Sequence, residues 1–457
     1  MHKKYPVIIC GAGIAGIATA YYLATQHKIT DILLVDKHAP LSQTTAKSGE
    51  NYRNWWPRTA MVDFINRSIN LMEGLAEQTE NAIQMKRQGY VYGTTVDDPT
   101  PLVQGLTQRY STLDVGPIRV HGDLSQTYLA SITQPGRVQP QVGADVLLNR
   151  ELIRQSYPHL SSDVSALVHV RRAGDISVQQ LGMHLLTVAR EQGVRLLQGE
   201  VRSINQPSAG TTSVEIETQD GLIHATTERF VNAAGPFAAR LLTMVDVDLP
   251  IHTVFQQKIA IQDPLAIVPR HAPFTSYLDE QSLSWSAEEQ AFWAAEPDAG
   301  WLLDRFPGGL HVRPEGSGDS TWIKLGWAYN REPSAPVWEP PTSEAFPEIM
   351  LRGVSTLVPG LQAYIQKIPQ PIVHYGGYYV KTPENLPLVG PINCEGMYIV
   401  SALAGFGTMA GCAAGELCAA WVADGPLPDY AEALSPVRYE DADYVANLGS
   451  LNVEGEL

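Results

Sequence analysis

Residues 5–36, YPVIICGAGIAGIATAYYLATQHKITDILLVD, decide the fold of this chain. An apolar strand leads into the turn Gly11-x-Gly13-x-x-Gly16, then a helix of small residues, then a second strand that ends at Asp36. Gly11 lets the chain turn sharply out of the strand, and Gly13 lets the backbone approach a pyrophosphate at the positive helix N-terminus. Gly16 lets the helix lie close to the sheet. Strand, turn, helix and acid in this register predict a dinucleotide site.

The acid at the end of the second strand narrows the choice of dinucleotide. Asp36 lies twenty residues beyond Gly16, where a carboxylate accepts hydrogen bonds from an adenosine ribose. Its negative charge would repel a 2'-phosphate, so the pattern disfavours NADP. Ile14 and Ala15 inside the turn, and Lys37 beside the acid, join the candidate cofactor-binding residues.

Composition and charge limit the possible partners. A chain of 457 residues is long enough for two or three domains. Hydrophobic residues make up 44% and charged residues 18%, as is typical of globular proteins. The formal net charge is −16, and the sequence has no basic cluster. This balance argues against nucleic acid as a partner.

The cysteines and one long apolar segment bear on location. Cys10, Cys394, Cys412 and Cys418 form no CxxC pair and lie in apolar segments, which favours buried free thiols over disulfides or metal ligands. Free thiols persist in a reducing compartment, so we expect a cytoplasmic protein. The stretch 397–423 is long and apolar, but its alanines and glycines suit a helix inside a protein better than lipid. We therefore expect no membrane span and no metal site.

Strand, helix and turn patterns alternate along the chain and predict a discontinuous fold. The segments 59–81 and 178–192 have helical spacing, 89–148 reads as short strands between Gly and Pro, and 201–235 reads as antiparallel strands that end in a parallel one. We predict an α/β (α+β two-domain) fold, in which a Rossmann-like domain with an antiparallel β-meander lies beside a mixed β-sheet domain. The expected boundaries are 1–80, 165–248 and 370–440 for the first domain, 81–164 and 249–369 for the second, and 441–457 for a C-terminal tail.

Four further sequence blocks follow the glycine turn in order. They are SGENYR at 48–53, EQGVRLLQGEVRSI at 191–204, FVNAAGP at 230–236, and YVKTPENLPLVG at 379–390 together with GFGT at 405–408. With the glycine turn and Asp36, these blocks span almost the whole chain. The set resembles the D-amino-acid oxidase (DAO) family of FAD-dependent oxidoreductases, which includes glycine oxidase, sarcosine oxidase and dimethylglycine dehydrogenase.

The resemblance assigns parts of FAD to these blocks. It implies that the backbone of Val201 holds the adenine, that Gly235 passes near the pyrophosphate, and that 405–408 lines the pyrimidine side of the flavin. The late turn also has a physical reason, because a helix that begins near Thr408 directs its positive end toward the negative edge of a reduced flavin. The candidate cofactor-binding residues of these blocks are Ser48, Gly49, Val201, Ala234, Gly235, Gly405, Phe406, Gly407 and Thr408.

Departures from the family pattern bear on attachment and substrate. Relatives that bind FAD covalently use a cysteine just before the TyrThr-type segment or a histidine near the second strand. Here 375–381 contains no cysteine and 39–60 no histidine, so we expect non-covalent FAD. Monomeric sarcosine oxidases carry a lysine after the late glycine turn. The matching position is Met409, which argues against a simple N-methyl amino acid.

The candidate catalytic residues are Arg53, Lys258, Arg313 and Tyr378, and the sequence leaves an alternative role open for Arg53, Lys258 and Tyr378. Arg53 either binds a substrate carboxylate bidentately or lies in solvent or against phosphate. Lys258 either faces the flavin as an oxygen-activating or N5-bonded cation or is an exposed strand lysine. Arg313 resembles the carboxylate-binding arginine of glycine oxidase-like relatives. Tyr378 follows two glycines and either approaches a ring or packs as a sheet aromatic, whereas His311 reads as structural.

Three functional hypotheses remain open on the sequence. The first is an FAD-dependent oxidoreductase in which an amine or amino acid C–H gives hydride to flavin N5, the imine hydrolyses, and oxygen or an electron carrier accepts the electrons. The second is a dehydrogenase of a hydroxy compound on the same fold. The third is a flavoprotein with a mainly assembly or interaction role. The sequence contains no HExxH, GxSxG or paired-carboxylate signature, which fits a hydride transfer that needs no acid/base pair. The expected partner is a small-molecule substrate.

Overall fold

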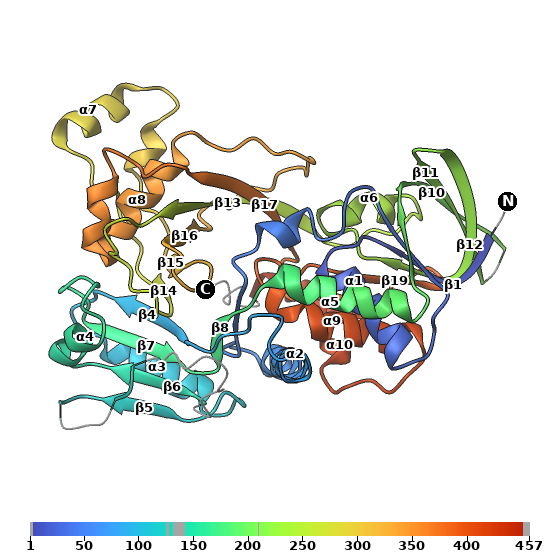
Figure 1. The fold of residues 1–457 in the computed structure, drawn as a ribbon, viewed down its shortest axis with the longest axis horizontal. Helices are drawn as coiled ribbons and strands as arrows, with labels where there is room; N and C mark the ends of the chain where they lie inside the picture. Colours follow the sequence, from blue (N-terminus) through green and yellow to red (C-terminus); the bar gives the residue numbers. More distant parts are fainter. Residues whose placement is uncertain (1–2, 125–127, 131–141, 209, 451–457) are drawn as a thin grey trace.

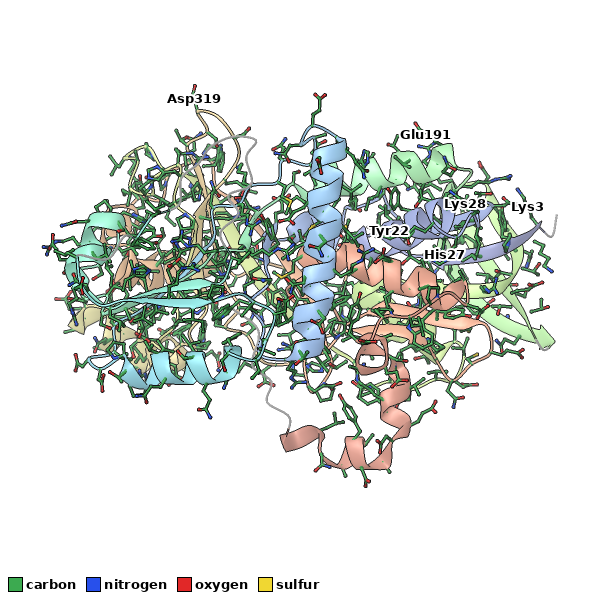
Figure 2. All side chains as sticks on the ribbon, turned by 90° about the horizontal axis from the view of Figure 1, so that it is seen from below. Lys3, Tyr22, His27, Lys28, Glu191 and Asp319 are labelled. Atoms are coloured by element: carbon green, nitrogen blue, oxygen red, sulfur yellow. The ribbon has the colours of Figure 1, made fainter. Side chains whose placement is uncertain are left out.

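Two large sheets organise the chain and lie side by side (Figure 1). The computed structural model describes residues 3–124, 128–130, 142–208 and 210–450. These residues form a first sheet of eight strands and a second sheet of nine. Figure 2 shows helix α2 (Thr59–Gln78), in light blue, standing between the two halves of the molecule. The predicted fold class, a mixed α/β fold built on two sheets, is confirmed.

The first sheet has a parallel core that begins with the quoted N-terminal stretch. The strand β1 pairs in parallel with β2 on one side and β12 on the other, so Val7 lies opposite both Ile32 and Arg229. Further parallel pairs join β2 to β9 and β12 to β19. In spatial order the parallel strands are β19 (Met397–Ser401), β12 (Gly221–Asn232), β1 (Lys3–Cys10), β2 (Ile32–Asp36) and β9 (Arg195–Gln198).

Three helices cover one face of this parallel core (Figure 1). They are α1 (Ile14–Thr25), α5 (Val178–Glu191) and α9 (Gly407–Val422), and α1 contacts both of the others. Small residues bring α1 and α9 together, because a Cβ on Gly415 would lie 2.4 Å from the Cβ of Ala18. Since β1 leads into α1 and β19 into α9, both helices begin at the carboxyl edge of the sheet. Ligands bind at this edge in open α/β sheets.

The antiparallel meander extends the first sheet from β12 and packs over the other face of its parallel core. Strands β10 (Glu200–Ser208) and β11 (Thr211–Thr218) pair antiparallel, and β11 pairs antiparallel with β12. A buried apolar cluster that includes Ile8, Phe230 and Ile399 fills this face together with α6 (Ala238–Thr243). The predicted meander and its return into a parallel strand are therefore both present.

The second sheet is mixed and has its own core. Its neighbours pair antiparallel except for two parallel pairs, β14 with β4 and β5 with β6. Helix α8 (Phe346–Leu357) buries its apolar residues against β15 and β16. The strand order is β17 (Val373–Lys381), β13 (His252–Gln262), β16 (Trp322–Trp327), β15 (Leu310–Pro314), β14 (Phe274–Tyr277), β4 (Tyr90–Thr94), β7 (Ala166–Val170), β6 (Ala144–Leu147) and β5 (Ile118–His121).

The structure differs from the expected segment boundaries at two strands and one helix. Strands β7 and β17 pair inside the second sheet, although the predicted boundaries at 165 and 370 assign them to the first domain. Alternating apolar residues identify a strand but not its partner, so these limits were misplaced. The region 89–148, expected as short strands, also contains α3 (Thr100–Tyr110).

The C-terminal segment packs against the first sheet's side of the molecule. The predicted tail 441–457 begins with helix α11 (Ala442–Ala446), and its residues 451–457 lie outside the described residues. The Tyr444 hydroxyl donates to Glu384 over 3.1 Å, and Arg438 pairs with the same carboxylate at 2.8 Å. Among the described helices none is long and apolar enough to cross a membrane.

Candidate functional site

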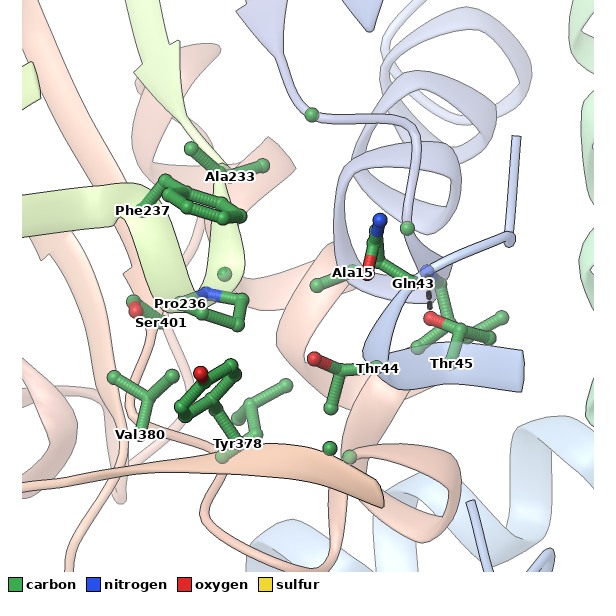
Figure 3. Close-up of a pocket in the computed structure, with 18 of the residues that line it drawn as sticks. Ala15, Gln43, Thr44, Thr45, Ala233, Pro236, Phe237, Tyr378, Val380 and Ser401 are labelled. Carbon is green, nitrogen blue, oxygen red and sulfur yellow. Dashed lines mark hydrogen bonds between the residues drawn. The ribbon is translucent and has the colours of Figure 1, made fainter. Parts of the chain in front are cut away.

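A cavity opens at the carboxyl edge of the parallel core (Figure 3). Residues at the ends of four parallel strands line it, among them Cys10, Asp36, Ala233 and Ser401. Figure 3 shows Gln43, Thr44 and Thr45 on one side of the cavity and Pro236, Phe237 and Tyr378 on the other. The cavity therefore lies where the glycine turn and the carboxyl ends of the strands meet.

The glycine turn forms one wall of this cavity. Gly11 has a φ of +115°, and a Cβ there would lie 2.1 Å from the carbonyl oxygen of Ala233. Gly13 is the N-cap of α1 and has no side chain to satisfy the first-turn N–H groups, although Ile14 N–H donates to Thr45 Oγ1 over 3.2 Å. The helix thus presents its positive end to the cavity, as an anion site requires.

Asp36, the predicted ribose-binding acid, lines the first cavity at the end of β2. One carboxylate oxygen accepts from the N–H of Ala12 at 2.7 Å and the other from the N–H of His38 at 2.9 Å. Burial raises the pKa of Asp36, and these two hydrogen bonds oppose the rise. Each oxygen keeps a lone pair for a hydroxyl group. Nearby, Lys37 pairs with Glu200 at 3.1 Å, and the same carboxylate also pairs with Arg240 at 2.8 Å.

Most of the predicted cofactor-binding residues line this one cavity. They are Gly11, Gly13, Ile14, Ala15, Asp36, Lys37, Ser48, Val201, Ala234, Gly235, Gly405, Gly407 and Thr408. Gly16 lies beneath the turn, where a Cβ would come within 1.9 Å of the Gly11 carbonyl oxygen, so it serves close packing as predicted. Gly49 and Phe406 instead line a second, adjoining cavity.

The second cavity lies between the two sheets and shares a border with the first. Four residues line both: Ser48, Lys258, Tyr379 and Gly405. A ring held at the inner end of the first cavity would therefore present one face to the second. The walls of the second cavity include Arg53, Trp56, Tyr90, Phe274, His311, Asn330, Arg331, Lys381, Phe406 and Met409.

The late glycine turn and Ser48 build this border. A Cβ on Gly405 would lie 2.5 Å from the Tyr379 ring, so the backbone passes directly over the aromatic side chain. Helix α9 begins at Gly407, two residues further on. The Thr408 hydroxyl lies 2.5 Å from that of Ser48, which ties the start of α9 to the 48–53 block. The positive end of α9 therefore faces the shared border.

Lys258 reaches the border from β13. It pairs across the sheet with Gly326 on one side and Tyr375 on the other, and it is 9% exposed. Its Nζ lies 5.8 Å from the centre of the Tyr379 ring, and the structure gives it no hydrogen bond or ion pair with the described residues. Burial, with the nearby Lys324 and Arg313 cations, lowers the pKa of Lys258 to about 8.

The other predicted catalytic residues have distinct places. Arg53, on β3 (Asn51–Arg53), lines the second cavity with its guanidinium carbon 4.5 Å from the Trp56 ring centre. It is buried. Tyr378 lines the first cavity, and its hydroxyl accepts from the N–H of Val337 at 3.1 Å. The sequence could not distinguish an approach to a ring from sheet packing, and the structure places Tyr378 at the cavity wall.

Arg313 does not lie where the resemblance placed it. Within the described part of the chain it is not among the residues that line either cavity. Its guanidinium donates to the carbonyl oxygens of Gly49 and Pro314, at 2.9 Å each, and pairs with Glu315 at 2.7 Å. These bonds occupy the planar donor fork that a carboxylate would need.

The structure adds cavity residues that the sequence did not single out. Trp338, from the proline-rich segment 332–341, lines the first cavity, as do Thr45 and Phe237. An aromatic residue inside a proline-rich linker was the available signal for Trp338. His311, expected to be structural, lines the second cavity.

Metal and thiol chemistry have little support in the described residues. Over the ranges that the structure covers, no group of three or more His, Cys, Asp and Glu side chains could hold a metal ion. The four cysteines are free. Cys10 lines the first cavity at its Asp36 end, where burial and that carboxylate raise the pKa of the thiol to about 12.

The first cavity fits a dinucleotide that carries a large ring. The N-termini of α1 and α9 both face it, so one can hold a pyrophosphate and the other the electron-rich edge of the ring. Gly11 and Gly405 leave room where a Cβ would collide with neighbouring protein atoms. Asp36 lies at one end and Lys258 at the other. FAD has the matching parts in this order.

Comparison with known protein families agrees with this fit. Residues 6–421 match the DAO family model, described as FAD dependent oxidoreductase. The mitochondrial dimethylglycine dehydrogenase of Rattus norvegicus is 23% identical over 439 residues, which cover 94% of this chain and 44% of that protein. Sarcosine oxidase subunit beta of Rhizobium meliloti is 25% identical over 256 residues, 54% of each chain. This chain thus spans less than half the length of the dimethylglycine dehydrogenase.

Solved structures show the same fold. The L-proline dehydrogenase of P. horikoshii has a TM-score of 0.71 at 18% identity and covers 96% of this chain and 99% of its own. Glycine oxidase from Geobacillus kaustophilus has a TM-score of 0.67 at 15% identity and covers 93% and 96%. The family match extends over most of the chain and includes the glycine turn, Asp36 and the late turn that line the first cavity. The chain belongs to the DAO family of FAD-dependent oxidoreductases.

Proposed function

We propose that this protein oxidises the C–N bond of an amine that carries a carboxylate, that is, of an amino acid. The observation that carries the proposal is the second cavity, which borders the ring end of the FAD cavity and contains two buried cations, Arg53 and Lys258. FAD, when bound, accepts a hydride from the substrate carbon and leaves an imine that water hydrolyses. The protein's own part is to bind the substrate and hold its C–H against the ring.

Arg53 is the residue that we assign to the substrate carboxylate. It is buried in the second cavity, and the Trp56 ring fixes its guanidinium from one side. A planar guanidinium binds a carboxylate through two parallel hydrogen bonds, so it fixes orientation as well as position. Arg313, whose donors go to backbone carbonyls and Glu315, is assigned to holding the loop at Gly49.

An amine substrate fits the charges better than a hydroxy compound. Oxidation of an alcohol needs a base for the O–H proton, whereas a neutral amine can give hydride without losing a proton first. Three titratable groups on the cavity wall could accept a proton, and each is poorly suited. Burial and Lys258 lower the pKa of His311 to about 3. Protonated Lys258 is itself a cation, and the Glu50 carboxylate pairs with Lys324 at 3.2 Å. The hydroxy-compound reading is therefore the second candidate. The cavity beside the ring, with two buried cations in its wall, favours turnover over a mainly structural role.

Non-covalent attachment of FAD is part of the proposal. Among the described residues that line the first cavity, the single cysteine is Cys10. It lies at the Asp36 end, where the adenosine belongs, and its high pKa disfavours the thiolate. His311 is hydrogen-bonded in the wall of the second cavity. The expected FAD therefore dissociates on denaturation.

Anaerobic reduction of the purified yellow protein tests the proposal. Bleaching of the flavin by amino acids, with no bleaching by the corresponding hydroxy acids, is the expected result. Bleaching by hydroxy acids alone would select the second candidate, and bleaching by neither would leave only a structural role. Admitting air then identifies the acceptor: peroxide release indicates oxygen, and slow reoxidation indicates an electron carrier.

A further inference from the structure

His311 has a fixed orientation in the wall of the second cavity. It lies on β15, pairs across the sheet with Gly326 and Ser276, and is 4% exposed. The ring of Phe274 stacks on the imidazole with ring centres 4.7 Å apart. The sheet neighbours and this stacked ring hold the imidazole plane in place.

One hydrogen bond decides which nitrogen carries the proton. His311 Nδ1 lies 3.1 Å from the carbonyl oxygen of Gly309, and a carbonyl can only accept, so Nδ1 donates. In a neutral imidazole the other nitrogen, Nε2, then has a free lone pair. Nε2 makes no hydrogen bond with the residues that the structure describes.

The charges around the ring keep it neutral. Three cations, Lys258, Arg313 and Lys324, face His311 from β13, β15 and β16, and burial with Lys258 as the nearest of them lowers the pKa of the imidazole. Gly326 brings Lys258 and His311 to the same spot, because a Cβ there would lie 3.1 Å from Lys258 Cγ and 2.5 Å from His311 Nε2. His311 is therefore a neutral acceptor beside the Lys258 cation, whereas the Glu50 carboxylate on the same wall pairs with Lys324 at 3.2 Å.

A neutral acceptor beside a cation discriminates between amines. Lys258 repels an ammonium group, so the substrate amine binds in its neutral form. A neutral primary or secondary amine still has an N–H to donate to Nε2. A neutral tertiary amine has none, and it would direct its own lone pair at that of His311.

We propose that His311 Nε2 accepts the substrate's amine N–H and thereby restricts the site to primary and secondary amino acids. This inference rests on the proposed function, since it needs a carboxylate-bearing amine in the second cavity. Arg53 holds the carboxylate and His311 the amine, so the carbon between them is fixed at the border with the FAD cavity. His311 acts here as a substrate-binding residue that sets specificity.

The test uses the FAD-loaded enzyme and two planar ligands that cannot be oxidised. Pyrrole-2-carboxylate and 2-furoate have the same carboxylate and ring shape, but pyrrole has an N–H where furan has an oxygen. Their dissociation constants are measured from the change in flavin absorbance. We expect the wild-type protein to bind the pyrrole about tenfold more tightly than the furan. A factor of this size is typical when one ligand makes a hydrogen bond and the other leaves the acceptor unpaired.

Variants then identify the acceptor. His311→Leu should bind both ligands equally, whereas His311→Gln, whose amide oxygen can take the place of Nε2, should retain part of the preference. His374→Leu is the matched control, because His374 lies on β17 of the same sheet and lines neither cavity among the described residues. It should retain the full preference. Flavin content, read from the absorbance of each variant, verifies that the protein has folded.

Three outcomes would overturn the inference: equal affinities in the wild-type protein, a preference that survives in His311→Leu, or no absorbance change with either ligand. None of these readouts needs turnover. A protein that shows the N–H preference but is not bleached by any amine would instead contradict the proposed function. In turnover, secondary amino acids should reduce the flavin at least about tenfold faster than their N,N-dialkyl counterparts.

Discussion

The indole of Trp338 stacks on the ring of Phe237 with ring centres 4.1 Å apart, and both side chains line the first cavity. Phe237 belongs to the first sheet's connection after β12, whereas Trp338 comes from the segment between β16 and α8. Gln43 donates to the Trp338 carbonyl at 3.4 Å, and Lys37 lies 5.1 Å from the indole centre. The proline-rich segment 332–341 therefore spans the cavity and joins both halves of the molecule.

Trp338→Ala should release FAD faster. The substitution removes the stacked pair and opens the cavity near its adenosine end, so we expect the FAD dissociation rate to rise about tenfold, in line with the stabilisation of about 1 kcal/mol or more from an aromatic pair and its burial. The rate is measured by flavin fluorescence after dilution. Trp301→Ala is the control, since Trp301 is 43% exposed and is not a described residue of either cavity. An unchanged rate in Trp338→Ala would mean that the segment does not retain FAD.

The position of Trp338 in the cavity wall could not be predicted from the sequence. The proline-rich segment is visible in the sequence, but its course depends on backbone bonds such as Ser334 N–H to the Thr253 carbonyl at 2.7 Å. Such a pairing between distant segments leaves no periodic signal. By contrast, each glycine of the N-terminal turn has a separate local requirement, and the structure shows those of Gly11 and Gly16 directly. The cofactor half of the site was therefore predictable.

The substrate side of the site was less predictable. It depends on which face of the sheet each side chain lies on, and on which hydrogen-bond donors are already used by other residues. The alternation of apolar and polar residues identifies Lys258 as a strand residue. The face of the sheet on which its side chain lies depends on its pairing with Gly326, which belongs to β16, the third strand after β13 in the sequence. The resemblance located Arg313 near the site, yet only the structure shows that its donors are already used by Gly49 and Pro314. His311 gave no sequence signal, since its role depends on Gly309 and the cavity.

Arg53 and Arg313 should behave differently when substituted. Arg53→Ala removes the proposed carboxylate partner, so the substrate dissociation constant should rise about 10- to 100-fold with unchanged FAD content, because hydrogen bonds to charged groups contribute about 1.5–3 kcal/mol. Anaerobic flavin titration measures this. Arg53→Lys should recover only part of the affinity, since an ammonium cannot bind bidentately.

Arg313→Ala should act on stability. It leaves Glu315 and Glu50 with Lys324 as their shared partner and removes the donors to Gly49, so we expect unfolding to become easier by about 3 kcal/mol. Thermal unfolding measures this loss. A variant with normal stability and a strongly raised substrate dissociation constant would restore the carboxylate role that the resemblance implied for Arg313.

Lys258→Met should stabilise the apoprotein at neutral pH. The folded-state pKa of about 8 lies below the usual 10.5, so below pH 8 the folded chain holds a cation that water would solvate better. The buried charge lowers the free energy of unfolding by its full amount below pH 8. This loss of stability fades as pH rises toward 10.5, where the folded and unfolded chains have both lost the proton. We expect the free energy of unfolding at pH 7 to rise by about 2 kcal/mol, with little gain at pH 10.

The same substitution should impair the enzyme. If the Lys258 cation acts at the flavin, wild-type turnover falls as pH rises through about 8, and Lys258→Met is slow at every pH. Lys258→Arg keeps its charge across this range, so its activity should lose the decline near pH 8. Turnover of Lys258→Met equal to that of the wild-type protein would show that the lysine serves only the fold.

Gly405 and Gly407 provide a matched pair in the late turn. A Cβ on Gly405 would lie 2.5 Å from the Tyr379 ring, whereas one on Gly407 would meet only Leu403 Cβ, at an ordinary 3.8 Å. Gly405→Ala should therefore lower the melting temperature of the apoprotein, and Gly407→Ala should leave it unchanged. Tyr379→Leu combined with Gly405→Ala should recover part of the loss, because a smaller side chain relieves the contact.

Gly407→Ala, which should not change stability, should nevertheless weaken FAD binding. Gly407 lines the first cavity at the start of α9, so a methyl group there occupies the space between the helix N-terminus and the ring edge. We expect Gly407→Ala to weaken FAD binding at least about tenfold although its apoprotein is as stable as the wild type, because the added group separates a charge from the N–H groups that hold it. Titration of the apoproteins with FAD measures this. Equal FAD affinity in Gly407→Ala and wild type would show that the flavin does not bind next to this helix. The assignment of the flavin ring to the border at Gly405 and Lys258 would then be wrong.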